Sequence, residues 1–294
     1  IGLMENNLNI VFFGTPDYVV PILDCLNKTF KGRTEPSITA VVTQGPKPTG
    51  RKQILAHSPV DAWAHKRKIP VYYQAEDLFK ENSKFDLGVI ADYGKIISQK
   101  VIDLFVHGII NIHFSLLPKY RGASPIQKAI LSGDREIGVT IFKIDEKLDH
   151  GPVIAQFKEP IEDKDTWGSL KIRLFEKTKD VLMELLPAYL KGKVKLKIQN
   201  ESQATYTKIL KKEDGYLDLK KAKPEEAERF IRAMDPWPGA WTKIKILDTK
   251  ILRLKLLKSH IEDNKLVLDE VQLEGKNPVT WEELLRGYPK ASFT

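Results

Sequence analysis

The sequence predicts an α/β protein with a doubly wound, mainly parallel sheet, followed by a small β-rich domain. In the first two-thirds of the chain, apolar runs typical of strands alternate with amphipathic runs typical of helices. Beyond residue 208 the strand-like runs are short, which is typical of a small β-barrel. We therefore expect a first domain over residues 1–190, a linker over 191–207 and a C-terminal domain over 208–294.

The strands of the first domain are predicted where the chain is apolar and rich in β-branched residues, over 8–13, 38–43, 87–91, 109–113 and 138–142. Helices are predicted over 18–26, 59–67 and 166–190, and another begins at a Ser-Pro pair at 124–125. Only Gly14 follows the first strand. Because the glycine-rich dinucleotide fingerprint is absent there, a nicotinamide or flavin cofactor is disfavoured.

Lysines alternate through residues 191–197, which indicates an extended, exposed linker. An edge strand protected by lysines and a nucleic-acid contact are the two readings of this pattern. The C-terminal domain is predicted to hold a helix over 224–234 and strands over 241–246, 251–257, 265–268 and 271–273. Its strands carry a basic strip, which fits either a phosphate backbone or the solvated face of a sheet. The strip comprises Lys243, Lys245, Lys250, Arg253, Lys255 and Lys258.

Composition narrows the class of protein. The chain has 294 residues, of which 42% are hydrophobic and 29% charged, as in a soluble globular protein. No apolar run approaches the length of a membrane span and no export signal is present, so we expect a cytoplasmic protein with no membrane partner. A single cysteine excludes an internal disulfide. The net charge of +8 weakly favours a polyanionic partner.

Polar side chains appear where the apolar run at 109–113 ends. Asn111 and His113 are two apart, so they project from the same face of this strand, near its C-terminal end. In open parallel sheets ligands bind at that end. Asp149 follows His113 by 149 − 113 = 36 residues, which leaves room for one helix and one strand that bring it back. Singly, such an Asn or His is more often structural, but together the three indicate a site.

The chain resembles the folate-dependent formyltransferases, and most closely those that act on tRNA. The motifs that carry the resemblance are found at residues 111–127, 138–140 and 148–151, and further ones at 13–16, 58–60, 93–94, 235–238 and 284–288. The resemblance therefore extends over nearly the whole chain. It implies an OB-like fold for the C-terminal domain.

The resemblance also implies a reaction, in which 10-formyltetrahydrofolate donates a formyl group to the α-amine of methionyl-initiator-tRNA without a metal. Asn111 and His113 are then expected to stabilise the oxyanion of a tetrahedral intermediate. Asp149 is expected to orient His113, favour its cationic form and help to remove the amine proton. Folate-binding residues are expected at Ala91, Asp92, Tyr93, Gly94, Ser115, Leu116, Leu117 and Pro118.

A polar, basic segment at 44–53 is predicted to form a mobile loop. By the resemblance, this loop reaches tRNA. The residues expected to contact tRNA are Lys47, Arg51, Lys52, Arg121, Lys243 and Lys245. For Arg121 an ion pair that stabilises its loop is an equal alternative. Asp92 and His150 depart from the family pattern, and both could alter the pH profile.

Two other functions remain open. An amino-sugar nucleotide N-formyltransferase would share the catalytic residues, although the basic segments argue against it. A non-catalytic tRNA-binding protein is the alternative of another class, and intact Asn111, His113 and Asp149 argue against that. We expect a monomer.

Overall fold

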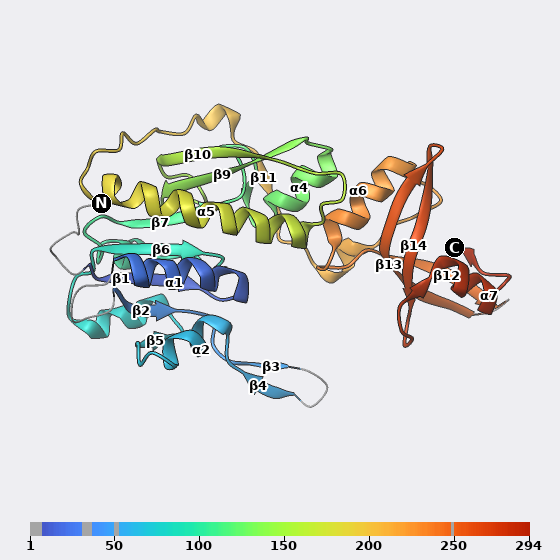
Figure 1. The fold of residues 1–294 in the computed structure, drawn as a ribbon, viewed down its shortest axis with the longest axis horizontal. Coiled ribbons are helices and arrows are strands. Elements are labelled where there is room, and N and C mark those ends of the chain that lie inside the picture. The colour runs from blue at the N-terminus through green and yellow to red at the C-terminus, as the bar shows by residue number, and fades with distance from the viewer. Residues whose placement is uncertain (1–7, 31–36, 50–52, 248–249) are drawn as a thin grey trace. The chain divides into compact units, whose positions relative to one another are not determined.

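The computed structural model describes residues 8–30, 37–49, 53–247 and 250–294 (Figure 1). The chain divides into two compact units. Unit 1 comprises residues 1–121, 138–158 and 172–206, and unit 2 comprises 122–137, 159–171 and 207–294. The division therefore differs from the expected domain boundaries, because two inner segments group with the C-terminal residues, and all of the expected linker except residue 207 groups with unit 1.

A seven-stranded sheet forms the centre of unit 1. Its strands, in spatial order, are β10 (Val153–Pro160), β9 (Glu136–Lys143), β7 (Ile109–His113), β6 (Leu87–Ala91), β1 (Ile10–Gly14), β2 (Ile38–Val42) and β5 (Val71–Tyr72). Strands β7, β6, β1, β2 and β5 pair in parallel, and β9 runs antiparallel to β7. This confirms the mainly parallel sheet.

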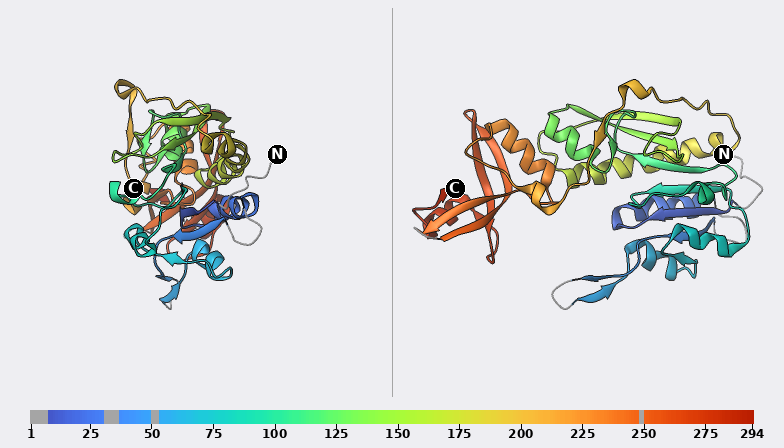
Figure 2. Two further views of the ribbon diagram at one scale, coloured as in Figure 1. Left: turned by 90° about the vertical axis from the view of Figure 1, so that its left-hand side faces the viewer. Right: turned by 180° about the vertical axis from the view of Figure 1, so that it is seen from behind.

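Helices cover both faces of this sheet. α1 (Val20–Thr29) and the part of α5 (Trp167–Leu190) in unit 1 lie on one face (Figures 1 and 2). On the other face, the 3-10 helix η2 (Ala75–Glu81) and α3 (Gln99–Ile102) pack on a buried cluster that includes Val11, Phe13 and Ile109. Because side chains alternate along a strand, Asn111 and His113 share the face of β7 that carries Ile109.

Two segments of unit 1 differ from the expected loops. Of the segment 44–53, β3 (Lys47–Thr49) pairs with β4 (Ile54–Ala56), which lies just beyond it, in a short antiparallel hairpin that is followed by α2 (Pro59–His65). The segment after α5 is largely exposed, but Lys197 exchanges two backbone hydrogen bonds with Val153, of 2.8 and 2.9 Å. Farther on, β11 (Tyr206–Thr207) pairs with β8 (Arg121–Gly122). This stretch is therefore tied to unit 1.

Unit 2 holds an antiparallel five-stranded sheet. Its order is β15 (Val279–Thr280), β14 (Lys265–Leu273), β13 (Lys250–Glu262), β12 (Trp241–Leu247) and β16 (Ser292–Phe293). Its helices are α4 (Pro125–Ser132), α6 (Pro224–Met234) and α7 (Trp281–Gly287). The two strands expected at 265–268 and 271–273 are one continuous strand. Throughout the described ranges, no helix is both long and apolar enough to cross a membrane.

Candidate active site

Asn111 and His113 lie at the C-terminal end of β7, in the middle of the sheet. Asn111 is in register with Ile90 of β6 and Phe142 of β9, and His113 with Thr140 of β9. The His113 residue is buried, with 6% exposed, whereas Asn111 is half-buried. Among the residues that the structure describes, the Asn111 side-chain amide has no hydrogen-bond partner. Its donors therefore remain available to a ligand.

Asp149 reaches His113 from the loop after β9. Its Oδ2 atom lies 3.5 Å from Nδ1 of His113, and only 7% of the His113 and 12% of the Asp149 side chain is exposed. This separation allows an ion pair but exceeds the length of a good charge-assisted hydrogen bond. The structure thus brings together the imidazole and the carboxylate, with the Asn111 amide two residues before His113 on the same face of the strand.

Both ring nitrogens of His113 face acceptors, because Nε2 lies 2.9 Å from the carbonyl oxygen of Tyr120. A neutral imidazole can donate through only one nitrogen, whereas the cation donates through both. With both acceptors in these positions, neither ring nitrogen is directed at a substrate, which differs from the expected role of His113.

The loop after β7 is fastened to β9 and β10. The Thr140 hydroxyl donates to the Ser115 carbonyl over 2.6 Å and accepts from the Leu117 N–H over 3.1 Å. Gln156 donates to the Leu117 carbonyl and to Thr140, over 3.0 and 2.9 Å. Gly138 leaves room for Leu116, because a Cβ atom there would lie 2.3 Å from Leu116 Cγ. Thr140 and Gln156 were not predicted as site residues, since their partners lie far away in the sequence.

This fastening limits which of the expected folate-binding groups face a ligand. Ser115 and Leu117 are buried, and the Ser115 hydroxyl donates to the Lys119 carbonyl. Leu116 and Pro118 are half-buried. Of these four expected residues, only Leu116 and Pro118 therefore remain partly accessible.

The segment that follows β6 offers fewer ligand contacts than expected. Ala91 and Tyr93 are buried, Asp92 is half-buried and Gly94 is exposed. The Tyr93 ring packs edge-on against Phe13 with centroids 5.7 Å apart, so its side chain belongs to the core. Burial, together with the charges of acidic neighbours, raises the pKa of Tyr93 to about 12. A side-chain contact from Tyr93 to folate is therefore not supported.

Asp92 makes a contact that was not foreseen, because its carboxylate accepts a hydrogen bond from the Tyr18 hydroxyl. Burial and the nearby Asp92 charge raise the pKa of Tyr18 well above its ordinary value. The Tyr18 ring stacks on Phe175 at 5.2 Å, and Phe175 meets Phe114 at 4.6 Å. No motif in the sequence distinguished Tyr18, since its partners come from other elements.

The position of Arg121 corrects the expectation that this residue contacts tRNA, because Arg121 does not lie on the surface as such a contact requires. Only 1% of the residue is exposed, and its guanidinium makes a two-pronged ion pair with Glu201, of 2.6 and 3.1 Å. The Glu201 hydrogen bond raises the pKa of Arg121 further. The alternative from the sequence, an ion pair that stabilises the loop, is the arrangement found.

The other expected tRNA contacts fall into two groups. Lys47 is exposed on β3, while Arg51 and Lys52 lie outside the described residues. On β12, Lys243 is exposed and Lys245 half-buried, and Lys243 is in register with Arg253 of β13. Arg253 also lies over the Trp241 ring, 3.9 Å from its centroid. The face shared by β12 and β13 is therefore basic and aromatic.

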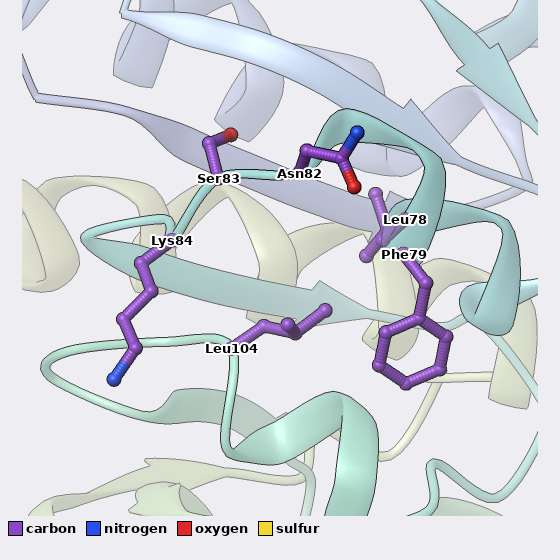
Figure 3. Close-up of a pocket in the computed structure, with 6 residues that line it drawn as sticks. All are labelled: Leu78, Phe79, Asn82, Ser83, Lys84 and Leu104. Carbon is purple, nitrogen blue, oxygen red and sulfur yellow. The ribbon is translucent and has the colours of Figure 1, made fainter.

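A small hollow in unit 1 lies apart from these groups (Figure 3). Its lining residues are Leu78, Phe79, Asn82, Ser83, Lys84 and Leu104. Lys84 is its single ionisable side chain, and it offers no nucleophile paired with a base. In the part of the chain described, no group of three or more His, Cys, Asp or Glu side chains is arranged to hold a metal ion.

The sequence matches known formyltransferases over most of its length. The formyl transferase family matches residues 8–186, and the family described as "Formyl transferase, C-terminal domain" matches 209–289. The methionyl-tRNA formyltransferase of Thermotoga maritima is 35% identical, over 95% of this chain and 95% of that protein. The methionyl-tRNA formyltransferase of Marinobacter nauticus is 39% identical, over 81% of this chain and 76% of that protein.

A solved structure shares the fold. An N-formyltransferase from Helicobacter canadensis, crystallised with folinic acid and dTDP-3-aminofucose, superposes with a TM-score of 0.66 at 19% identity, over 93% of this chain and 98% of that one. At this identity the likeness concerns the fold alone, whereas the two relatives above are similar in sequence along most of the chain. The chain therefore belongs to the formyltransferase family, among the methionyl-tRNA formyltransferases.

Proposed function

We propose that Asn111, His113 and Asp149 are the catalytic residues with which this enzyme transfers the formyl group of 10-formyltetrahydrofolate to the α-amine of methionyl-initiator-tRNA. The observation that carries this proposal is the contact between the His113 ring and Asp149, beside the unengaged amide of Asn111, at the end of a central strand. The family membership of the chain supports the same reaction.

In the proposed mechanism, the neutral α-amine attacks the formyl carbon and forms a tetrahedral intermediate with an oxyanion. The Asn111 amide donates to this oxyanion, and the positive charge of His113 stabilises it. One such donor contributes roughly a hundred- to a thousandfold in rate. Asp149 orients His113, and water beside its carboxylate takes up the amine proton. The bond between the formyl carbon and the folate nitrogen then breaks, and that nitrogen is protonated.

The two substrates would occupy different residues. Folate would lie along Asp92 and Gly94 and the accessible side chains of Leu116 and Pro118, and no step requires a metal. Lys47, Lys243 and Lys245 would meet tRNA phosphates, since each side chain is at least partly exposed. We also propose that the enzyme acts as a monomer and in the cytoplasm, where bacterial translation begins.

An acceptor panel tests this function. The protein is incubated with 10-formyltetrahydrofolate and, in parallel, methionyl-initiator-tRNA, uncharged tRNA, free methionine or a dTDP-amino sugar, and formylated product is measured. We expect formylation of the charged tRNA alone. Formylation of the sugar nucleotide alone would identify the enzyme as an amino-sugar formyltransferase, and salt-sensitive tRNA binding without any product would indicate a non-catalytic protein.

A further inference from the structure

We propose that Gln199 is a positioning residue that holds Asp149 in reach of His113. This inference rests on the proposed function. Gln199 lies in the segment between the two matched family stretches, which end at residue 186 and begin again at 209. The match to the family therefore gives this residue no role.

Both the nitrogen and the oxygen of the Gln199 side-chain amide form hydrogen bonds. Its Nε2 atom donates to the carbonyl oxygens of Asp149 and Gly151, over 2.9 and 2.8 Å. Its Oε1 atom accepts from Nε and Nη2 of Arg121, over 3.2 and 2.8 Å. Both N–H groups of the amide and both lone pairs of its oxygen are thus engaged, and the residue is only 8% exposed. Its orientation is therefore fixed.

Asp149 needs such support because its backbone has a φ of +47°, in the left-handed region that residues with a side chain rarely adopt. The two carbonyls that Gln199 holds flank His150. From the other side, Nδ1 of His150 lies 2.5 Å from Asp145 and Nε2 lies 3.3 Å from Glu201. The segment 199–201 therefore fastens the loop that directs the Asp149 carboxylate.

The opposite end of Gln199 reaches the residue next to the His113 contact. Arg121 directly follows Tyr120, whose carbonyl accepts from His113, and the backbone N–H of Arg121 donates to the Thr205 carbonyl over 2.8 Å. One amide thus joins the loop that carries Asp149 to the loop that holds the imidazole. This connection sets the separation between the carboxylate and the ring.

A double-mutant cycle tests the role. Gln199→Glu keeps an acceptor for Arg121 but removes both donors to the Asp149 loop. Gln199→Met removes the donors and the acceptor without adding charge. Each is made in the wild-type and in the Asp149→Asn background. Gln203→Glu is the matched control, since it makes the same change on an exposed side chain of the same segment.

We expect each Gln199 variant to lower kcat about tenfold or more in the wild-type background, while the KM values for both substrates change little. In the Asp149→Asn background the same substitution should lower kcat by less than about twofold, because the group it positions is already gone. Gln203→Glu should leave kcat unchanged.

The positioning role of Gln199 would be overturned by any of three results. These are an equal loss of kcat in both backgrounds, a wild-type kcat in both Gln199 variants, or a change confined to a rise in KM. Circular dichroism and Tm ensure that folded protein is compared, and the Glu variant keeps the Arg121 contact should the Met variant fail to fold. Failure of the proposed function has a different signature, since wild-type enzyme would then not formylate methionyl-tRNA or Asp149→Asn would be fully active.

Discussion

Asp149 faces Nδ1 of His113 across 3.5 Å, in a site where both side chains are almost buried. We expect Asp149→Asn to lower kcat at least about a hundredfold, because the amide can neither balance the charge of His113 nor orient the ring as a carboxylate does. Steady-state formylation of methionyl-tRNA measures this loss.

Glu146→Gln is the control for that substitution, because Glu146 is an exposed carboxylate of the same loop. It should retain wild-type kcat. Circular dichroism should be unchanged in both variants. Near-normal turnover of Asp149→Asn would remove the carboxylate from the mechanism.

Single residues also show where sequence reasoning succeeds. The pairing of His113 with Asp149 could be predicted, because the 36-residue spacing leaves room for a helix and a strand that bring the acid back, and the family resemblance implies the same contact. The position of Arg121 could not. Its partners Gln199 and Glu201 lie 78 and 80 residues farther along the chain, and nothing local distinguishes a buried guanidinium from an exposed one. The second contact of His113, to the Tyr120 carbonyl, was missed because a backbone acceptor leaves no sequence signal.

At the scale of elements, strands buried on both faces were predicted closely, and β6 and β7 have the bounds that their apolar runs indicate. β10 was not predicted from the sequence. Beyond Ile154, its residues alternate between more buried and exposed positions, and they include charged side chains. β14 was split in prediction by Asp269 and Glu270, which interrupt the apolar run while the backbone continues. Pairing with a neighbouring strand decides such cases, and this pairing is not local.

Asp61, near the start of α2, should make the stability of the fold depend on pH. The Asp61 side chain is fully buried and contacts His57 over 2.8 Å, His65 over 2.5 Å and the Tyr73 hydroxyl over 2.9 Å. Burial opposes its charge, but the hydrogen bonds from His57 and Tyr73 prevail and lower the pKa of Asp61. A lowered pKa stabilises the fold above the unfolded value of about 3.9, and this contribution disappears as the pH falls through the folded value.

Asp61→Asn should therefore reduce Tm by roughly 3 °C or more at pH 7, and the difference from wild type should shrink below about pH 4. Thermal unfolding followed by circular dichroism across this pH range measures it. Asp163→Asn, on an exposed carboxylate, should show no such difference at any pH. A Tm difference that stays constant from pH 7 to the acid limit would argue against this role for the Asp61 charge.

A second prediction concerns Gly138 of β9, which contacts the loop after β7. A Cβ atom at Gly138 would lie 2.3 Å from Leu116 Cγ and 2.7 Å from the Leu116 backbone nitrogen. Gly138→Ala should destabilise the protein by about 1–3 kcal/mol and raise the KM for the formyl donor, because the loop must shift. Gly287→Ala is the control, since no atom lies within 4 Å of the added Cβ. An unchanged KM in the Gly138 variant would show that this loop does not border the folate.

At the scale of the whole molecule, the two units differ in what their surfaces offer. Unit 1 holds the His113 and Asp149 pair, whereas unit 2 presents a basic strip on β12 and β13. Lys243 lies directly opposite Arg253, and like charges opposite each other on a sheet destabilise it. This repulsion is relieved when phosphates lie across the strip. The strip therefore fits the polyanionic partner that the net charge of +8 weakly favoured.

Replacing both Lys243 and Lys245 by Ala tests this surface. Each lysine that neutralises a phosphate contributes about 0.7–0.9 to the slope of log K against log salt concentration, so the double variant should lose roughly 1.4–1.8 from that slope. The affinity for tRNA should fall at low salt, and kcat at saturating tRNA should stay near the wild-type value, because neither lysine belongs to the proposed catalytic residues. Lys265→Ala with Lys276→Ala removes the same charge from other exposed positions of unit 2 and should leave the slope unchanged. An equal loss of slope in both double variants would mean that net charge, rather than this strip, attracts the tRNA.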